Sequence, residues 1–300
     1  MNRIISTLAL LGLLSGCAAS QPAASFDIRE FLNMPYTDGP EADSLQSLHL
    51  VVPQSETASP LLIWIGGGAW AYVNKDMELD LARNLGRKGI AVASVGHRLS
   101  PAVWRDPKKT EGIQHPKHAE DVAAAVKWLY DHAAEYGYDR EKFFIGGYSS
   151  GAHLAALLDL DKGFLGKYDL SPDLFKGVIP ISGAFDMVEY YKVFLNGERP
   201  EMAEQHVKAV FGPTEKDLIA ASPTSYLENL STPMLLMCDN NLYNYTRLFE
   251  DRIRATAFRD VRVMYAYNFS HSALWRDLSS DQPSIYRNAI IEFIDMESRS

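Results

Sequence analysis

The stretch Gly147-Tyr-Ser-Ser-Gly151 decides how this chain of 300 residues is interpreted. It lies between residues 142–146, whose apolar character predicts a buried strand, and residues 152–158, which predict a helix. A serine at a sharp turn from a strand to a helix takes a strained backbone conformation, and flanking glycines let the strand and the helix pass close together. The pattern therefore predicts that Ser149 raises its hydroxyl above a sheet, in the position of a nucleophile.

Strand-like and helix-like segments alternate on both sides of this turn. The predicted strands are 47–52, 61–65, 90–95, 143–146, 178–182, 234–238 and 261–267, and the main predicted helices are 76–88, 118–136, 152–158, 245–257 and 283–296. Continuous apolar strands that alternate with helices are typical of a parallel sheet covered on both faces. Because binding sites of such sheets lie at the carboxyl ends of the strands, candidate site residues should closely follow a strand.

Composition and charge fit one large globular domain, predicted over residues 27–300. The chain is 47% hydrophobic and 22% charged, with a formal net charge of −9. A negative balance argues against nucleic acid or an anionic membrane surface as the main partner. The sequence contains no clustered set of His, Asp or Glu ligands, so neither a metal nor a cofactor is expected.

The first 16 residues predict a signal peptide that is not part of the fold. Arg3 supplies the positive start, and residues 4–14 form an apolar stretch too short to span a bilayer. The ending Leu14-Ser-Gly-Cys17 resembles the bacterial lipobox, in which the signal is cleaved before a cysteine that then carries lipid. An ordinary signal peptide that happens to contain a cysteine is the alternative.

The lipobox resemblance implies a location and a partner. Lipid on Cys17, followed by a tether over residues 17–26, would anchor the protein to a membrane of the bacterial cell envelope. Ala18 rather than aspartate follows the cysteine, which by resemblance implies the periplasmic side of the outer membrane. With Cys17 lipidated, Cys238 has no cysteine left to pair with.

Several segments, in this order and spacing, resemble the α/β-hydrolase superfamily, close to its carboxylesterase and feruloyl-esterase-like branch. The matching segments are 62–70, 93–101, 121–128, 136–140, 147–154 and 221–223. The resemblance implies an α/β-hydrolase fold, with a mostly parallel central sheet of about eight strands and helices on both faces. It also implies a serine esterase that cleaves carboxylic esters of small molecules through an acyl-enzyme on Ser149.

The resemblance also implies a triad in the order serine, acid, histidine. His271 follows the last predicted strand by four residues and is the expected base. Asp239 is the only carboxylate on the loop after strand 234–238, whereas this family usually places its carboxylate about where Asn241 stands. Asp239 is the expected acid, and Asn241 or another group stays open as the third member.

The run of glycines directly after the predicted strand 61–65 implies an oxyanion hole. By resemblance, its donors are the backbone amides of Gly67, Gly68 and Ser150. Gly66 stands where the family usually has a histidine that helps to hold this loop. Trp70 and Tyr148 are expected to contact the substrate, and an insertion over residues 185–231 is expected to cap the pocket.

Two other functions stay open on the sequence alone. One is an amidase or peptidase of the same fold, such as a formamidase. The other is a lipid-anchored binding protein that has lost catalysis, which the missing loop histidine and the irregular acid position favour. Retention of Ser149, Gly151 and His271 favours an enzyme.

Overall fold

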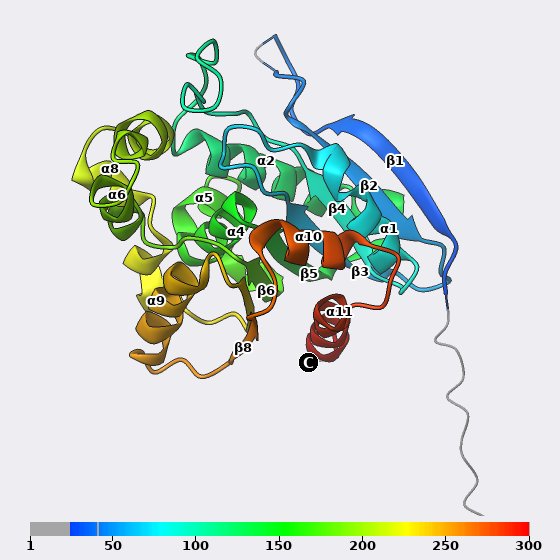
Figure 1. Cartoon of the computed structure of the whole chain (residues 1–300). Coiled ribbons are helices and arrows are strands. Elements are labelled where there is room, and N and C mark those ends of the chain that lie inside the picture. Colours follow the sequence, from blue (N-terminus) through cyan, green and yellow to red (C-terminus); the bar gives the residue numbers. More distant parts are fainter. Residues whose placement is uncertain (1–24, 41, 300) are drawn as a thin grey trace, which may run out of the picture.

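A single eight-stranded sheet forms the centre of the protein in this computed structural model, which describes residues 25–40 and 42–299 (Figure 1). Its spatial order is β1-β2-β4-β3-β5-β6-β7-β8. Strand β2 is antiparallel to both of its neighbours, and every pair from β4 to β8 is parallel. The bounds are β1 Ile28–Pro35, β2 Ser47–Pro53, β3 Ser59–Ile65, β4 Ala91–Val95, β5 Tyr138–Tyr148, β6 Phe175–Ile181, β7 Met234–Asp239 and β8 Val261–Ala266. The predicted mostly parallel sheet is thereby confirmed.

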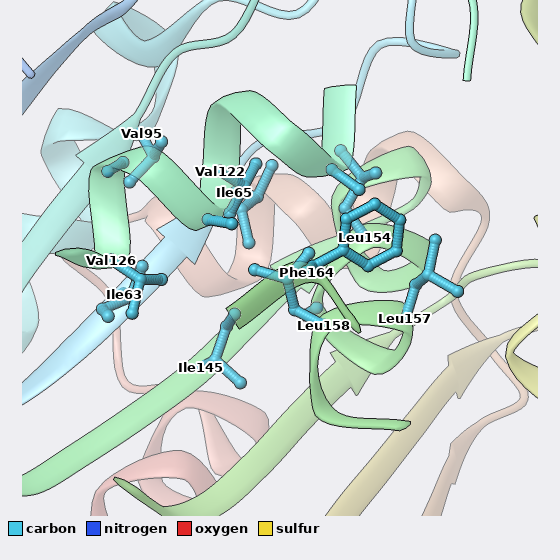
Figure 2. Packing of buried hydrophobic residues seen from close by; sticks show 14 of the residues in the cluster. Ile63, Ile65, Val95, Val122, Val126, Ile145, Leu154, Leu157, Leu158 and Phe164 are labelled. Atoms are coloured by element: carbon cyan, nitrogen blue, oxygen red, sulfur yellow. The ribbon is translucent and has the colours of Figure 1, made fainter. Parts of the chain in front are cut away.

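Helices cover both faces of the sheet, because alternate residues of the buried strands point in opposite directions. Ile63 and Ile65 of β3 pack in one cluster with α2 (Lys117–Asp131) and α4 (Ser150–Leu160). Figure 2 shows this cluster, in which Ile145 of β5 lies on the side of Leu158 of α4. Leu62 and Trp64 pack in the second cluster, with α1 (Leu79–Gly86), α10 (His271–Ser279) and α11 (Ile285–Glu297).

A third hydrophobic cluster and several shorter helical segments complete the fold. A third cluster packs Phe249 and Ile253 of α9 (Tyr243–Arg254) against Met234 and Leu236 of β7. The others are α3 Ala133–Tyr136, α5 Lys162–Gly166, α6 Met187–Leu195, α7 Ala209–Phe211, α8 Glu215–Ala220, η1 Lys75–Glu78, η2 Pro172–Leu174, η3 Ala203–Lys208 and η4 Pro223–Asn229.

The structure differs from the predicted elements in several places; the predicted helix 76–88, for example, is η1 followed by α1. Strand β1 is not predicted from the sequence, because it lies at the sheet edge and its side chains are all exposed or half-buried. The predicted helix 118–136 is two helices, since the chain leaves helical geometry at His132, whose Nδ1 lies 2.7 Å from the carbonyl oxygen of Trp128.

The predicted signal peptide and Cys17 lie outside the described residues. Within residues 25–40 and 42–299, no helix has both the length and the hydropathy needed to cross a membrane. Cys238 is a buried free thiol in β7.

Candidate active site

Ser149 occupies the turn between β5 and α4 with the strained backbone that its motif predicts. Its φ of 57° is in the left-handed region, and its amide donates to the carbonyl of Ile181 over 2.9 Å. The glycine at 151 is sterically required, because a Cβ there would lie 1.9 Å from the carbonyl oxygen of Ile65. A Cβ on Gly147 would lie 2.5 Å from the backbone of Gly151. The two glycines thus allow the close strand–helix contact that raises Ser149 at the sheet edge.

Asp239 and His271 meet at the same edge. Asp239 is the last residue of β7 and His271 the first residue of α10, and Asp239 Oδ2 lies 2.7 Å from His271 Nδ1. The carboxylate is 1% exposed, and its other oxygen accepts from the backbone amides of Asn241 and Leu242 at 2.8 and 3.1 Å. This geometry is that of an acid that orients a catalytic base.

The hydrogen bonds of Asp239 also keep it ionised. Burial by itself raises the pKa of the carboxyl, but hydrogen bonding to His271 and Ser182 outweighs burial and lowers the pKa below its ordinary value. Asp239 therefore carries its negative charge at neutral pH, as the partner of an imidazole that becomes positive during a reaction must.

Asn241 contacts His271 at a different atom. Its side-chain Oδ1 accepts from the backbone amide of His271 over 2.8 Å. His271 begins α10, and Ser270, which precedes it, makes no side-chain capping bond. Since the first amides of a helix have no partner within the helix, Asn241 satisfies one of them from outside and fixes the start of α10. Asp239 thus holds the imidazole ring of His271, and Asn241 holds its backbone.

Tyr148 also holds the same histidine. Its hydroxyl donates to the carbonyl oxygen of His271 over 2.6 Å and lies 3.3 Å from Asp239 Oδ2. The two rings are 4.9 Å apart between centroids. Burial, together with the charge of Asp239, raises the pKa of the phenol, so Tyr148 stays neutral and acts as a donor.

A pocket of about 280 Å³ opens beside Ser149, close to the lower end of the range for small-ligand sites. It is lined by Gly67, Gly68, Tyr72, Asn74, Met77, Glu78, Tyr148, Ser149, His271, Ser272 and Trp275. Five of these residues are predicted from the sequence. The others lie just after the glycine loop or at the start of α10. They are close in sequence to predicted residues, and this closeness could have been used to find them.

The glycine loop 66–68 bends sharply against the serine. A Cβ on Gly67 would lie 3.0 Å from Ser149 Cβ. Gly68 has a φ of 153°, and a Cβ there would lie 2.5 Å from the amide nitrogen of Val73. Ser150, the third predicted donor, is the first residue of α4, where amides have no partner within the helix. Gly67 and Ser150 therefore both adjoin Ser149, as an oxyanion hole requires.

Trp70 does not reach the pocket, so its predicted contact with substrate is not supported. The tryptophan is 3% exposed, its Nε1 donates to His153 Nδ1 over 3.2 Å, and its ring lies 4.8 Å from that of Phe211. Ala69 and Trp70 both have positive φ, at 49° and 58°. These two residues turn the chain back beneath the loop and place the tryptophan in the core. Burial lowers the pKa of His153 to about 3, so this histidine is a neutral acceptor.

The insertion 185–231 does not line the pocket either. Its helices α6, α7 and α8 contribute no residue to the described lining. Aromatic side chains of the insertion pack elsewhere: Tyr190 and Phe211 both lie against Trp70, and Tyr190 also lies against Tyr245 of α9. The insertion predicted as a cap therefore lies away from the described pocket, with α6 and α8 to one side of the sheet (Figure 1).

Comparison with known proteins gives the chain a family. The family model described as BD-FAE matches residues 48–241. A kynurenine formamidase of Salmo salar is 27% identical over 58% of this chain and 52% of its own length. Esterase LipQ of Mycobacterium tuberculosis is 26% identical over 60% of this chain and 41% of its own. The chain spans about half the length of these curated relatives, or less.

Solved structures give the fold. Esterase B from Lactobacillus rhamnosis superposes with a TM-score of 0.74 at 20% identity, covering 91% of this chain and 87% of that one. A truncated carbohydrate esterase from gut microbiota superposes with a TM-score of 0.68 at 19% identity, covering 93% and 99%. Likeness of this extent shows the α/β-hydrolase fold predicted from the sequence.

Proposed function

The chain belongs to the BD-FAE family, and on that premise we propose that it is a serine hydrolase that cleaves carboxylic esters of small molecules through an acyl-enzyme on Ser149. One observation carries the proposal. The His271 imidazole, held by an ionised Asp239 at 2.7 Å, lines the same small pocket as a serine on a strained strand–helix turn. Nucleophile, base and orienting acid therefore come from three separate strand ends to one place, which a structural role does not require.

The first half of the reaction forms the acyl-enzyme. Ser149 Oγ attacks the ester carbonyl carbon while His271 Nε2 takes its proton. The carbonyl oxygen becomes negative and is stabilised by the amides of Gly67, Gly68 and Ser150. When the intermediate collapses, the carbon–oxygen bond to the alcohol breaks and His271 gives the proton to the leaving oxygen. Asp239 stays ionised throughout and stabilises the imidazolium.

The second half regenerates the enzyme. A water molecule attacks the acyl carbon and gives a proton to His271. The bond between the acyl carbon and Ser149 Oγ then breaks, the serine regains its proton from His271, and the carboxylic acid leaves. The steps use only the ester, one water molecule and this chain's residues, and the enzyme returns to its starting state.

Amide cleavage is the second candidate, because kynurenine formamidases are among the relatives. A panel of substrates separates the candidates. We expect kcat/KM for p-nitrophenyl acetate and butyrate to exceed that for the octanoate by tenfold or more, since the pocket of about 280 Å³ restricts long chains. Formanilide tests amide cleavage. Faster turnover of formanilide than of p-nitrophenyl acetate would favour the formamidase, and no turnover of either above the Ser149→Ala background would favour a binding protein.

We also propose that lipid on Cys17 anchors the protein to the bacterial cell envelope, on the periplasmic side of the outer membrane. The lipobox-like residues Leu14–Cys17 support this proposal. We expect the full chain, expressed in a Gram-negative host, to incorporate labelled palmitate and to sediment with outer membranes. The Cys238→Ser variant, which keeps Cys17, should do the same. Exchanging residues 1–17 for a cleavable signal without cysteine should release soluble protein. Continued sedimentation of that form would contradict the anchor.

A further inference from the structure

Glu78 is a carboxyl group that the proposed reaction does not use. It ends the short helix η1 and lies directly before α1. Its side chain is 4% exposed, yet it lines the pocket that holds Ser149 and His271. Among the described residues of that lining it is the one carboxyl group. A buried carboxyl beside a reacting serine requires an explanation, because burial without a charged partner is costly.

Two contacts fix the carboxyl of Glu78 in place. Trp64 of β3 donates from its indole Nε1 to Glu78 Oε2 over 2.7 Å. The other oxygen lies over Gly66: a Cβ added to Gly66 would be 2.4 Å from Oε1 and 2.8 Å from Cδ. The carboxyl group therefore occupies the space into which a side chain at residue 66 would project. Residue 66 is also the position where the sequence departs from the family pattern.

The loop that begins at Gly66 is the one that adjoins the nucleophile. Gly67 follows at once and packs on Ser149, since a Cβ there would lie 3.0 Å from that of the serine. Gly66 has no side chain with which to fix itself. Its contact with Glu78 is therefore a support for the start of the loop that comes from another element.

We propose that Glu78 is a positioning residue for the oxyanion loop: held by Trp64, it fills the space beside Gly66 and keeps the amides of Gly67 and Gly68 in register with Ser149. This inference rests on the proposed function. It explains how the loop keeps its place without a side chain at residue 66, and it predicts that Glu78 acts on turnover rather than on substrate binding.

The protonation state of Glu78 fits this role. Burial raises its pKa to about 8, against the lowering effect of the hydrogen bond from Trp64. The other titratable or charged groups in the pocket and on β2, η1 and α1 are His49, Tyr72, Lys75, Asp76, Asp80, Arg83, Tyr148 and His271. None of them hydrogen-bonds Glu78, and His49 pairs with Asp76 instead. At pH 7 the carboxyl is mostly neutral and does not oppose the negative charge that develops on the substrate oxygen.

Raising the pH should ionise the carboxyl of Glu78 and so end its neutral state. Above pH 8 Glu78 ionises inside the pocket where the oxyanion forms, and two like charges repel each other more strongly when one of them is buried. We therefore expect kcat of the wild type to fall as the pH rises through 8. Glu78→Gln keeps the shape, stays neutral and still accepts from Trp64, so its kcat should stay level over the same interval.

The test compares Glu78→Gln and Glu78→Ala with the wild type on p-nitrophenyl acetate. At pH 7 we expect Glu78→Gln to keep kcat within about threefold. Glu78→Ala should lose about 10- to 100-fold in kcat with KM little changed, because a misplaced loop weakens only transition-state contacts. Asp80→Asn is the matched control, since this carboxylate is two residues away, exposed and outside the pocket. It should behave as the wild type does.

A second pair of variants tests the steric fit itself. Gly66→Ala should lower kcat, because the added methyl group collides with Glu78. Combining Gly66→Ala with Glu78→Ala removes the collision, and the double variant should be more active than Gly66→Ala alone. Tryptophan fluorescence supplies a readout that does not depend on turnover: the wild type should show a transition near pH 8 that Glu78→Gln lacks, because Trp64 bonds the carboxyl.

The outcomes are separable. Native kcat in Glu78→Ala, with no difference in pH profile between wild type and Glu78→Gln, would overturn this inference and leave the proposed function standing. A KM effect without a kcat effect would overturn it as well. Wild-type turnover no greater than that of Ser149→Ala would overturn the proposed function and this inference together. If Glu78→Ala does not fold, the Glu78→Gln profile and the fluorescence transition still decide.

Discussion

Replacing Ser149 with alanine is expected to lower kcat for p-nitrophenyl acetate by about 10⁶, the loss that follows when the nucleophile of such a triad is removed. Without Oγ no acyl-enzyme can form, and only the oxyanion donors and the binding pocket remain. The substitution removes one oxygen and keeps Cβ, so the strained backbone at 57° is not altered and the fold should be preserved. Initial rates corrected for spontaneous hydrolysis measure the effect.

The adjacent serine is the control for this experiment. Ser150 keeps its backbone amide in a Ser150→Ala variant, and its hydroxyl is buried without a hydrogen-bond partner among the described residues. We therefore expect Ser150→Ala to keep kcat within a few fold and to unfold at a similar temperature. More than about one per cent of wild-type kcat in a folded Ser149→Ala protein would mean that another group is the nucleophile.

Replacing Asp239 with asparagine is expected to cost about 10⁴ in kcat, the second largest effect. The physical reason lies in the two amides that bond the Oδ1 of Asp239. They will retain the carboxamide oxygen, which leaves the NH₂ group facing His271 Nδ1. Nδ1 must then accept rather than donate, so the proton resides on Nε2 and the imidazole cannot take the proton of Ser149.

A variant of Asn241 distinguishes the two possible assignments of the third triad member. Asn241→Ala removes only the acceptor of the His271 backbone amide, so we expect about a tenfold loss, from a less firmly held base. Measuring kcat of both variants at pH 8, with the fold checked by circular dichroism, decides between them. A near-native Asp239→Asn beside a strongly impaired Asn241→Ala would reverse the roles of Asp239 and Asn241.

The candidate catalytic positions can be largely found from the sequence, because they depend on local pattern and chain order. Ser149 is marked by glycines that a tight strand–helix contact requires, and His271 by its place after the last strand. Asp239 is the only carboxylate on its loop, yet its bond to the ring and the role of Asn241 depend on how that loop closes. No short-range sequence pattern indicates how the loop closes.

The misplaced and missed residues have a common physical origin. Trp70 follows the glycine loop and for that reason is predicted at the pocket, but two successive residues with positive φ turn it into the core. Glu78 is not predicted, because its approach to Gly66 requires η1 to fold back over the end of β3. In both cases the side chain's position is set by the path of a loop, and hydrophobic periodicity does not encode that path.

Covalent labelling of the purified protein with a fluorophosphonate is the decisive test of Ser149 as an activated nucleophile. The reagent phosphonylates a serine, with loss of fluoride, only where a base activates the serine and an oxyanion site receives the phosphonyl oxygen. Mass spectrometry of the tryptic digest should find one adduct per chain, on Ser149 within the peptide 143–162. Labelling should be absent in Ser149→Ala and at least a hundredfold slower in His271→Ala. An unlabelled wild type, or an adduct on any other residue, would contradict the proposed mechanism.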